Sequence, residues 1–236
     1  MLQIAGIQPL STVDWPGKLV LTVFCQGCPW ACVYCQNHQI LDPRTPGQVP
    51  WADVLDLLKK RVGLLDGVVF SGGEACRQAA PLLSAMQQVK DMGFAVGLHT
   101  AGAFPRVLET ALNSNLVDWV GLDIKAPASS YPQVVGKAGG NRAWESLEIL
   151  LEGAQRNLSS LFDYEVRLTV FPQMPFDPAE VVRTCAKMQV RTLVIQKAHS
   201  QGALPKFANT FTSWDAQYEK IKENLSQITD VKLLFR

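Results

Sequence analysis

Short apolar runs alternate with segments of helical periodicity along this chain of 236 residues, and few folds accommodate that alternation. Strands that alternate with helices form a parallel sheet with right-handed crossovers. We count six such units, fewer than a closed (β/α) barrel contains. The sequence therefore predicts an α/β fold, a partial, open (β/α)6 barrel. The predicted strands lie at 19–24, 67–70, 94–98, within 116–124, and at 164–171 and 191–196, and the predicted helices at 51–62, 79–91, 104–112, 143–156 and from Asp177 onward.

Composition and charge suggest an ordinary globular protein. Hydrophobic residues make up 47% of the chain, charged residues 18%, and the formal net charge is +1, so no strong field favours nucleic acid or an anionic membrane. The chain opens without a secretory signal pattern, and its apolar runs are too short to span a bilayer. We expect a cytoplasmic protein with one domain over 1–236, a lead-in at 1–18 and a tail of helix and strand from about 200 to 236.

Four of the six cysteines lie within eleven residues, at Cys25, Cys28, Cys32 and Cys35. In a reducing cytosol such a cluster is more often a metal site or a catalytic site than a set of disulfides. Thiolates from Cys28, Cys32 and Cys35 can hold three irons of a 4Fe–4S cluster and leave the fourth iron open. The amino and carboxylate groups of S-adenosylmethionine can chelate an open iron.

Two other metal sites are compatible with the same cysteines. A zinc site would use Cys25 as a fourth ligand, but the two Cys-x-x-Cys pairs are closer together than in most zinc sites. A closed four-thiolate cluster has a different familiar spacing. Under the open-cluster interpretation Cys25 is spare, and Cys76 and Cys185 are interpreted as structural thiols.

Other polar residues follow the predicted strands, where active sites of such folds lie. Gly72 and Gly73 permit positive φ and a close approach of a ligand to the backbone, and Glu74 offers a carboxylate to an ammonium group. Asp123 and Lys125 are two residues apart, so both can face the barrel interior. A polar cofactor would explain both charges, and a mutual salt bridge is the alternative.

Three residues on neighbouring strands complete this set. Thr100 can approach the cofactor, and His99 is either a cofactor neighbour or a structural histidine. Arg167 is a candidate for a bidentate contact with the cofactor carboxylate.

The Cys28, Cys32 and Cys35 run, with Tyr34 before the last cysteine, resembles the signature of the radical-SAM superfamily. The resemblance implies a 4Fe–4S cluster, S-adenosyl-L-methionine as cofactor and packing of Tyr34 near the adenine, with ordinary packing beneath the loop as the alternative. The Gly72–Glu74 turn is similar to the segment that holds the methionine amino group, although Ala75 stands where the family usually has proline.

The lead-in Ser-Thr-Val-Asp-Trp-Pro-Gly-Lys, the cysteine loop, the Gly-Gly-Glu turn and Leu-Asp-Ile-Lys-Ala-Pro together resemble activating proteins of anaerobic ribonucleoside-triphosphate reductase, over residues 7–127. That resemblance implies a 5′-deoxyadenosyl radical that takes hydrogen from a glycine of anaerobic ribonucleotide reductase or another glycyl-radical enzyme. It also implies a flavodoxin or ferredoxin as electron donor. The usual Pro-Tyr-Cys-His-Asn ending reads Val-Tyr-Cys-Gln-Asn here, which leaves the partner-facing details open.

Two alternative functions stay open at this point. The first is a radical-SAM enzyme with a small-molecule substrate, similar to the 7-carboxy-7-deazaguanine synthases, which would need a pocket rich in polar contacts. The second is a non-catalytic iron–sulfur or zinc protein.

Overall fold

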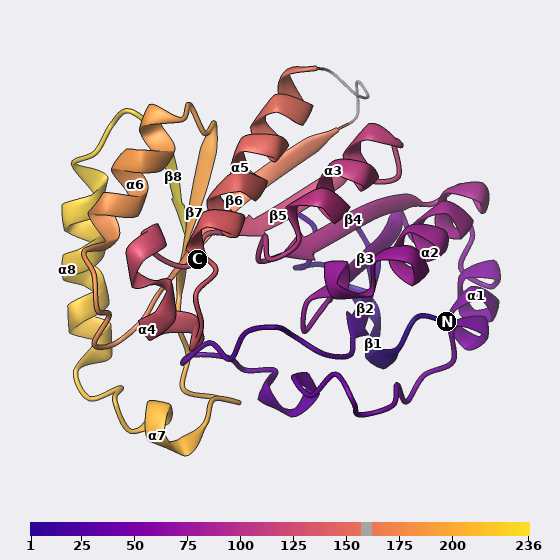
Figure 1. The fold of residues 1–236 in the computed structure, drawn as a ribbon, viewed down its shortest axis with the longest axis horizontal. Coiled ribbons are helices and arrows are strands. Elements are labelled where there is room, and N and C mark those ends of the chain that lie inside the picture. Colours follow the sequence, from indigo (N-terminus) through magenta and orange to yellow (C-terminus); the bar gives the residue numbers. More distant parts are fainter. Residues whose placement is uncertain (157–161) are drawn as a thin grey trace.

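A computed structural model describes residues 1–156 and 162–236. Eight strands form one curved sheet in the order β1 to β8, and the main helices lie on its outer face (Figure 1). None of the helices in the described ranges is long and apolar enough to cross a membrane. The strands are β1 (Ile4–Ser11), β2 (Val20–Cys25), β3 (Gly67–Gly72), β4 (Ala95–Thr100), β5 (Trp119–Asp123), β6 (Asp163–Val170), β7 (Thr192–Lys197) and β8 (Lys232–Phe235). The helices are α1 (Trp51–Lys59), α2 (Ala79–Asp91), α3 (Pro105–Asn113), α4 (Tyr131–Val135), α5 (Gly140–Gln155), α6 (Pro178–Lys187), α7 (Pro205–Ala208) and α8 (Trp214–Ser226).

The predicted open α/β barrel is confirmed, and the sheet is larger than six units. Strands β2 to β7 are the six predicted strands, and all of them pair in parallel. The apolar end of the tail adds β8 in parallel with β7, and the lead-in adds β1 antiparallel to β2. Because β1 and β8 form the two edges of the sheet, the barrel stays open on one side.

Side-chain alternation along each strand separates an outer core from an inner one. Leu21 and Val23 of β2 and Val68 and Phe70 of β3 are fully buried in the outer core, beneath the helices. Val20 and Val69, which have the opposite parity, belong to a small separate cluster inside the barrel. The larger core beneath the helices stabilises the sheet, and the inner face of the barrel can therefore carry polar residues.

The lead-in fills the barrel interior at the amino ends of the strands. Trp15 is 7% exposed and stacks on Trp119 with 5.7 Å between ring centroids. A Cβ atom on Gly97 of β4 would lie 2.9 Å from the Trp15 ring, so only glycine leaves room for this indole. The lead-in motif is therefore part of the barrel floor.

Replacing Trp15 with alanine should destabilise the protein by about 3–5 kcal/mol, because the cavity would remain between rigid strands. Urea unfolding measures this change. Val13→Ala is the control in the same segment, since the Val13 side chain is 78% exposed and should change the free energy of unfolding little. Equal effects of the two substitutions would contradict a structural role for the indole.

Candidate active site

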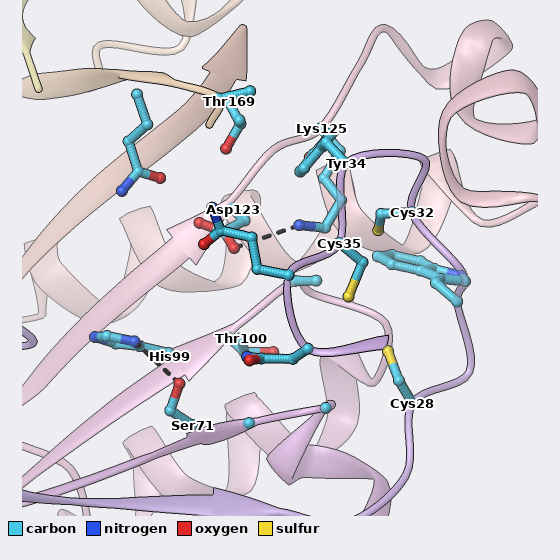
Figure 2. Close-up of a pocket in the computed structure, with 18 of the residues that line it drawn as sticks. Cys28, Cys32, Tyr34, Cys35, Ser71, His99, Thr100, Asp123, Lys125 and Thr169 are labelled. Carbon is cyan, nitrogen blue, oxygen red and sulfur yellow. Dashed lines mark hydrogen bonds and ion pairs between the residues drawn. The ribbon is translucent and has the colours of Figure 1, made fainter. Parts of the chain in front are cut away.

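A pocket of about 410 Å³ opens at the carboxyl ends of the strands, within the usual range for small-molecule sites (Figure 2). Its lining combines the cysteine loop with residues that end or follow β3, β4, β5, β6, β7 and β8. The predicted site residues that line it are Cys28, Cys32, Tyr34, Cys35, Gly72, Gly73, Thr100, Asp123 and Lys125.

The cysteine loop carries three free thiols into this pocket. Cys28, Cys32 and Cys35 are each partly buried, and Figure 2 shows them on one wall. The Cys28 N–H donates to the Leu41 carbonyl over 3.0 Å, and the Cys35 N–H donates to the Cys32 carbonyl over 3.0 Å. These backbone bonds hold the short loop in a shape that turns all three side chains toward the pocket.

Burial keeps the three thiols of the loop in their protonated form. Burial raises the pKa of Cys28 to about 12 and also raises the pKa of Cys32 and Cys35, although Lys125 opposes the increase in all three. The thiols are therefore protonated at neutral pH unless a metal displaces the protons. Three soft sulfur donors on one wall fit a 4Fe–4S cluster. Cys25 is fully buried at the end of β2, in the core beneath the helices.

The reason that glycine is required at Gly72 and Gly73 differs from the one predicted. Gly72 has φ +111°, as expected for glycine. However, a Cβ atom on Gly72 would lie 2.3 Å from the backbone N of Cys25, and one on Gly73 would lie 2.3 Å from the carbonyl O of Gly27. The close approach is thus made by the start of the cysteine loop. The glycines hold that loop against β3, and their backbone still lines the pocket.

Glu74 does not present its carboxylate to the pocket, which corrects the prediction. Its side chain is 1% exposed. One oxygen accepts hydrogen bonds from the Thr100 hydroxyl at 2.8 Å and the Cys76 N–H at 3.1 Å, and the other accepts from the Ala101 N–H at 2.8 Å. Burial is the main reason that the pKa of Glu74 is raised, and these bonds oppose it. Glu74 and Thr100 therefore tie the turn to the end of β4.

Asp123 and Lys125 meet beside Tyr34. The Lys125 ammonium lies 3.4 Å from Asp123 and 5.6 Å from the centre of the Tyr34 ring, so the salt bridge considered as the alternative is present, and both residues also line the pocket. Tyr34 packs on Phe171 with ring centroids 4.9 Å apart, and its buried hydroxyl has no hydrogen-bond partner within the described residues. The ring thus lines the pocket and also packs beneath the loop.

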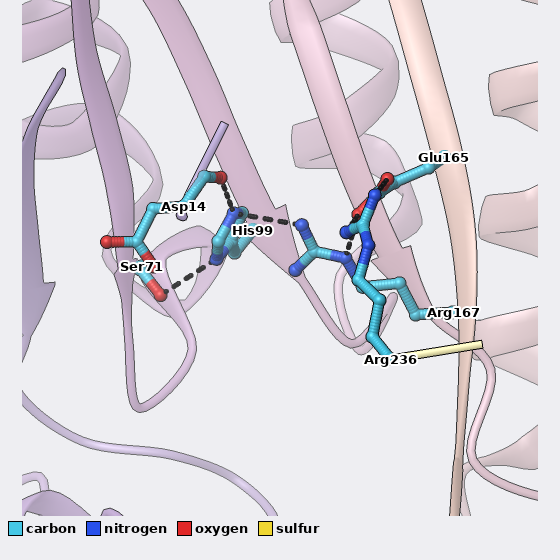
Figure 3. A network of polar contacts seen from close by, with 6 residues as sticks. All are labelled: Asp14, Ser71, His99, Glu165, Arg167 and Arg236. Atoms are coloured by element: carbon cyan, nitrogen blue, oxygen red, sulfur yellow. Dashed lines mark hydrogen bonds and ion pairs between the residues drawn. The ribbon is translucent and has the colours of Figure 1, made fainter. Parts of the chain in front are cut away.

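Arg167 lies deeper than predicted and does not reach the pocket lining. Its guanidinium contacts Glu165 at 2.7 Å (Figure 3). It also lies 5.2 Å from the centre of the Trp119 ring. Glu165 also binds Arg236 through two contacts of 3.0 Å. Glu165, two residues earlier on the same face of β6, contacts the guanidinium that was predicted to bind the cofactor carboxylate.

His99 connects this charged network to the lead-in. Its Nε2 lies 2.7 Å from the Asp14 carbonyl, and its Nδ1 lies 3.3 Å from the Ser71 hydroxyl. The carbonyl can only accept, so we assign the proton to Nε2, and Nδ1 then accepts from Ser71. Arg167 Nη2 lies 3.2 Å from Nε2, and since both nitrogens then carry protons this close approach is not a hydrogen bond. His99 is thus a hydrogen-bonded structural residue that also lines the pocket.

Acidification should destabilise the protein through His99. Burial and then Arg167 lower the pKa of His99 from 6.5 to about 4, so the unfolded chain binds more protons between these values. Stability should therefore fall as pH drops from about 6.5 to about 4, by on the order of 3 kcal/mol from this group. In His99→Gln, which keeps a donor for Asp14, urea unfolding should show a smaller loss over this range. An identical pH profile in both proteins would contradict this assignment.

Sequence reasoning missed the far wall of the pocket. This wall, opposite the cysteine loop, is lined by Thr169, Gln196, His199 and Arg236. Trp30, within the cysteine loop, also lines the pocket and was not predicted. The four residues of the far wall end or follow β6, β7 and β8, so the strand-end rule that predicted the other residues could have found them.

Comparison with known families decides the identity of this arrangement. The model of the radical SAM superfamily matches residues 22–185, from the start of β2 to α6. This chain belongs to the radical SAM superfamily. Membership implies a 4Fe–4S cluster and S-adenosylmethionine, and it agrees with three thiols at the mouth of a parallel barrel.

Related radical SAM proteins include glycyl-radical enzyme activating enzymes. A Methanocaldococcus jannaschii protein named as one is 30% identical over 134 residues, covering 56% of this chain and 54% of the relative. The pyruvate formate-lyase 1-activating enzyme of Escherichia coli is 30% identical over 173 residues, covering 70% and 67%. The 7-carboxy-7-deazaguanine synthase of Thermococcus kodakarensis is 24% identical, covering 61% and 64%. The chain thus matches half to two thirds of these relatives' lengths.

Solved structures share the fold at low identity. SuiB of Streptococcus suis bound to S-adenosylmethionine aligns with a TM-score of 0.65 and 11% identity, covering 89% of this chain and 48% of SuiB. QueE from Escherichia coli aligns with a TM-score of 0.55 and 16% identity, covering 100% and 93%. These similarities establish the radical SAM fold alone.

Proposed function

We propose that this protein is a radical SAM activase that removes a hydrogen atom from a glycine of anaerobic ribonucleotide reductase or a related glycyl-radical enzyme. The observation that carries the proposal is the convergence of three thiols from one loop on a pocket of an open barrel, in a chain 30% identical to activating enzymes. The lead-in and the Leu-Asp-Ile-Lys segment also resemble the reductase activases.

In this proposal Cys28, Cys32 and Cys35 hold the cluster. When bound, the cluster and S-adenosylmethionine supply one electron, from a flavodoxin or ferredoxin, and a 5′-deoxyadenosyl radical. Asp123 and Lys125 carry opposite charges beside the thiols, which suits the ammonium and carboxylate of the methionine end. The Tyr34 ring excludes water from that side, and its orphaned hydroxyl is available to a ligand.

The cationic side chains that line the pocket are already in contact with carboxylates. Each lysine and arginine side chain that lines the pocket contacts a carboxylate within the described residues, although Glu165 is shared between Arg236 and the deeper Arg167. The pairs are Lys125–Asp123 at 3.4 Å, Lys197–Asp215 at 2.5 Å and Arg236–Glu165 at 3.0 Å. A peptide glycine carries no charge, and the gap between β1 and β8 gives it a way in.

The test is anaerobic activation of a partner. The reconstituted protein, reductant and S-adenosylmethionine are mixed with an anaerobic ribonucleotide reductase, and the electron paramagnetic resonance spectrum is recorded. We expect a glycyl radical signal that depends on all three components. Formation of 5′-deoxyadenosine without a signal on this or any other glycyl-radical enzyme, together with turnover of a small molecule, would favour a synthase-like enzyme instead.

A further inference from the structure

A row of three polar side chains crosses the inner face of the sheet on the far wall. Thr169 of β6 is directly paired with Gln196 of β7. The Arg236 N–H donates to the Ile195 carbonyl and the Lys197 N–H donates to the Arg236 carbonyl, so Arg236 stands opposite Gln196 on the next strand. Thr169, Gln196 and Arg236, here called the polar row, all line the pocket.

The polar row faces the cysteine loop across the pocket. Figure 2 places Thr169 on the opposite side from Cys28. Both walls line the same pocket, so a substrate that occupies it lies between them. The row is therefore placed to contact the substrate at a point beyond the cofactor.

Two members of the polar row have unused hydrogen-bonding capacity. Thr169 and Gln196 are half-buried, and neither the Thr169 hydroxyl nor the Gln196 carboxamide forms a hydrogen bond within residues 1–156 and 162–236. Arg236, in contrast, is held by Glu165 through two contacts of 3.0 Å. The free groups of the row are thus neutral, and a carboxamide offers one donor and one acceptor side by side.

We infer that Gln196, with Thr169 beside it, binds the peptide backbone of the substrate segment that carries the glycine. The paired donor and acceptor of a carboxamide match the N–H and C=O of an extended chain. The inference rests on the proposed function, because it names the part of the site that recognises the peptide.

The test uses a blocked peptide, acetyl-Ala-Ala-Gly-Ala-Ala-amide, with deuterium on the glycine Cα. The reconstituted holoenzyme is incubated anaerobically with dithionite, S-adenosylmethionine and this peptide, and mass spectrometry measures deuterium in 5′-deoxyadenosine. Gln196→Ala, and the isosteric Gln196→Glu that lacks the donor, should raise the peptide concentration for half-maximal transfer about tenfold. The exposed Gln217 of α8 provides the matched control, and Gln217→Ala should behave as wild type.

Modified peptides test the same contact without changing the protein, so a folding defect of a variant cannot explain the result. Peptides N-methylated at the glycine, or at the residue after it, lose one backbone donor each. The peptide that lacks the N–H bound by Gln196 should bind the wild-type protein about tenfold more weakly than the unmodified peptide. Its affinity should not fall further in Gln196→Ala. Deuterium transfer with wild-type concentration dependence in both Gln196 variants would overturn the inference and leave the proposed function intact. 5′-Deoxyadenosine that never carries peptide deuterium would overturn both.

Discussion

Replacing Cys32 with alanine should abolish assembly of the cluster and lower 5′-deoxyadenosine formation by about 10³-fold or more. The thiol lines the pocket with those of Cys28 and Cys35, and the loop offers no other thiol there, since Cys25 lies in the outer core. Iron and sulfide analysis after anaerobic reconstitution, followed by product quantification, measures both effects.

The control for this variant is another buried cysteine. Cys185→Ala removes a thiol that is fully buried in α6, within the core. It should keep the iron content and product formation of the wild type, apart from a modest loss of stability. A Cys32→Ala protein that still bound iron and cleaved S-adenosylmethionine would refute the proposed ligand set.

Replacing Glu74 with alanine should destabilise the protein by about 4 kcal/mol, even before any cofactor is added. Two buried donors, on Cys76 and Thr100, and a half-buried one on Ala101 lose their acceptor, and each unsatisfied buried group costs about 1–3 kcal/mol. The free energy of unfolding in urea measures the change. Glu74→Gln keeps one acceptor oxygen and should lose about half as much.

This pair of variants separates the two roles considered for Glu74. If the carboxylate bound the ammonium of S-adenosylmethionine directly, Glu74→Ala would lower cofactor affinity and leave the stability of the cofactor-free protein almost unchanged. That outcome would contradict the buried, three-bond environment seen in the structure. Loss of stability in the cofactor-free protein supports a bracing role.

The fold was largely predictable from the sequence because the outer core depends on alternation along strands and periodicity along helices. Strand β1 escaped prediction because its exposed residues and Pro9 suit only an edge strand, which carries a weak apolar signal. Strand β8 was predicted only as part of a tail of helix and strand, without its place in the sheet. Both edges are held by pairing with one neighbour, which local sequence does not encode.

The site was predictable in position and less so in contacts. The strand-end rule placed the cysteine loop, Asp123 and Lys125 around one pocket. It could not give the depth of a side chain or its partner, so Arg167 and Glu74 were assigned to the cofactor. Glu165 forms an ion pair with Arg167, and three donors on the turn and at the end of β4 form hydrogen bonds with Glu74. These ion pairs and hydrogen bonds depend on the register between strands, which the sequence alone does not fix.

The central claim is that the three-thiol wall supports cleavage of S-adenosylmethionine. Its most direct test is anaerobic incubation of the reconstituted protein with dithionite and S-adenosylmethionine, with chromatographic quantification of the products. The structure predicts 5′-deoxyadenosine and methionine in equal amounts. An iron-loaded protein that left S-adenosylmethionine intact would contradict it.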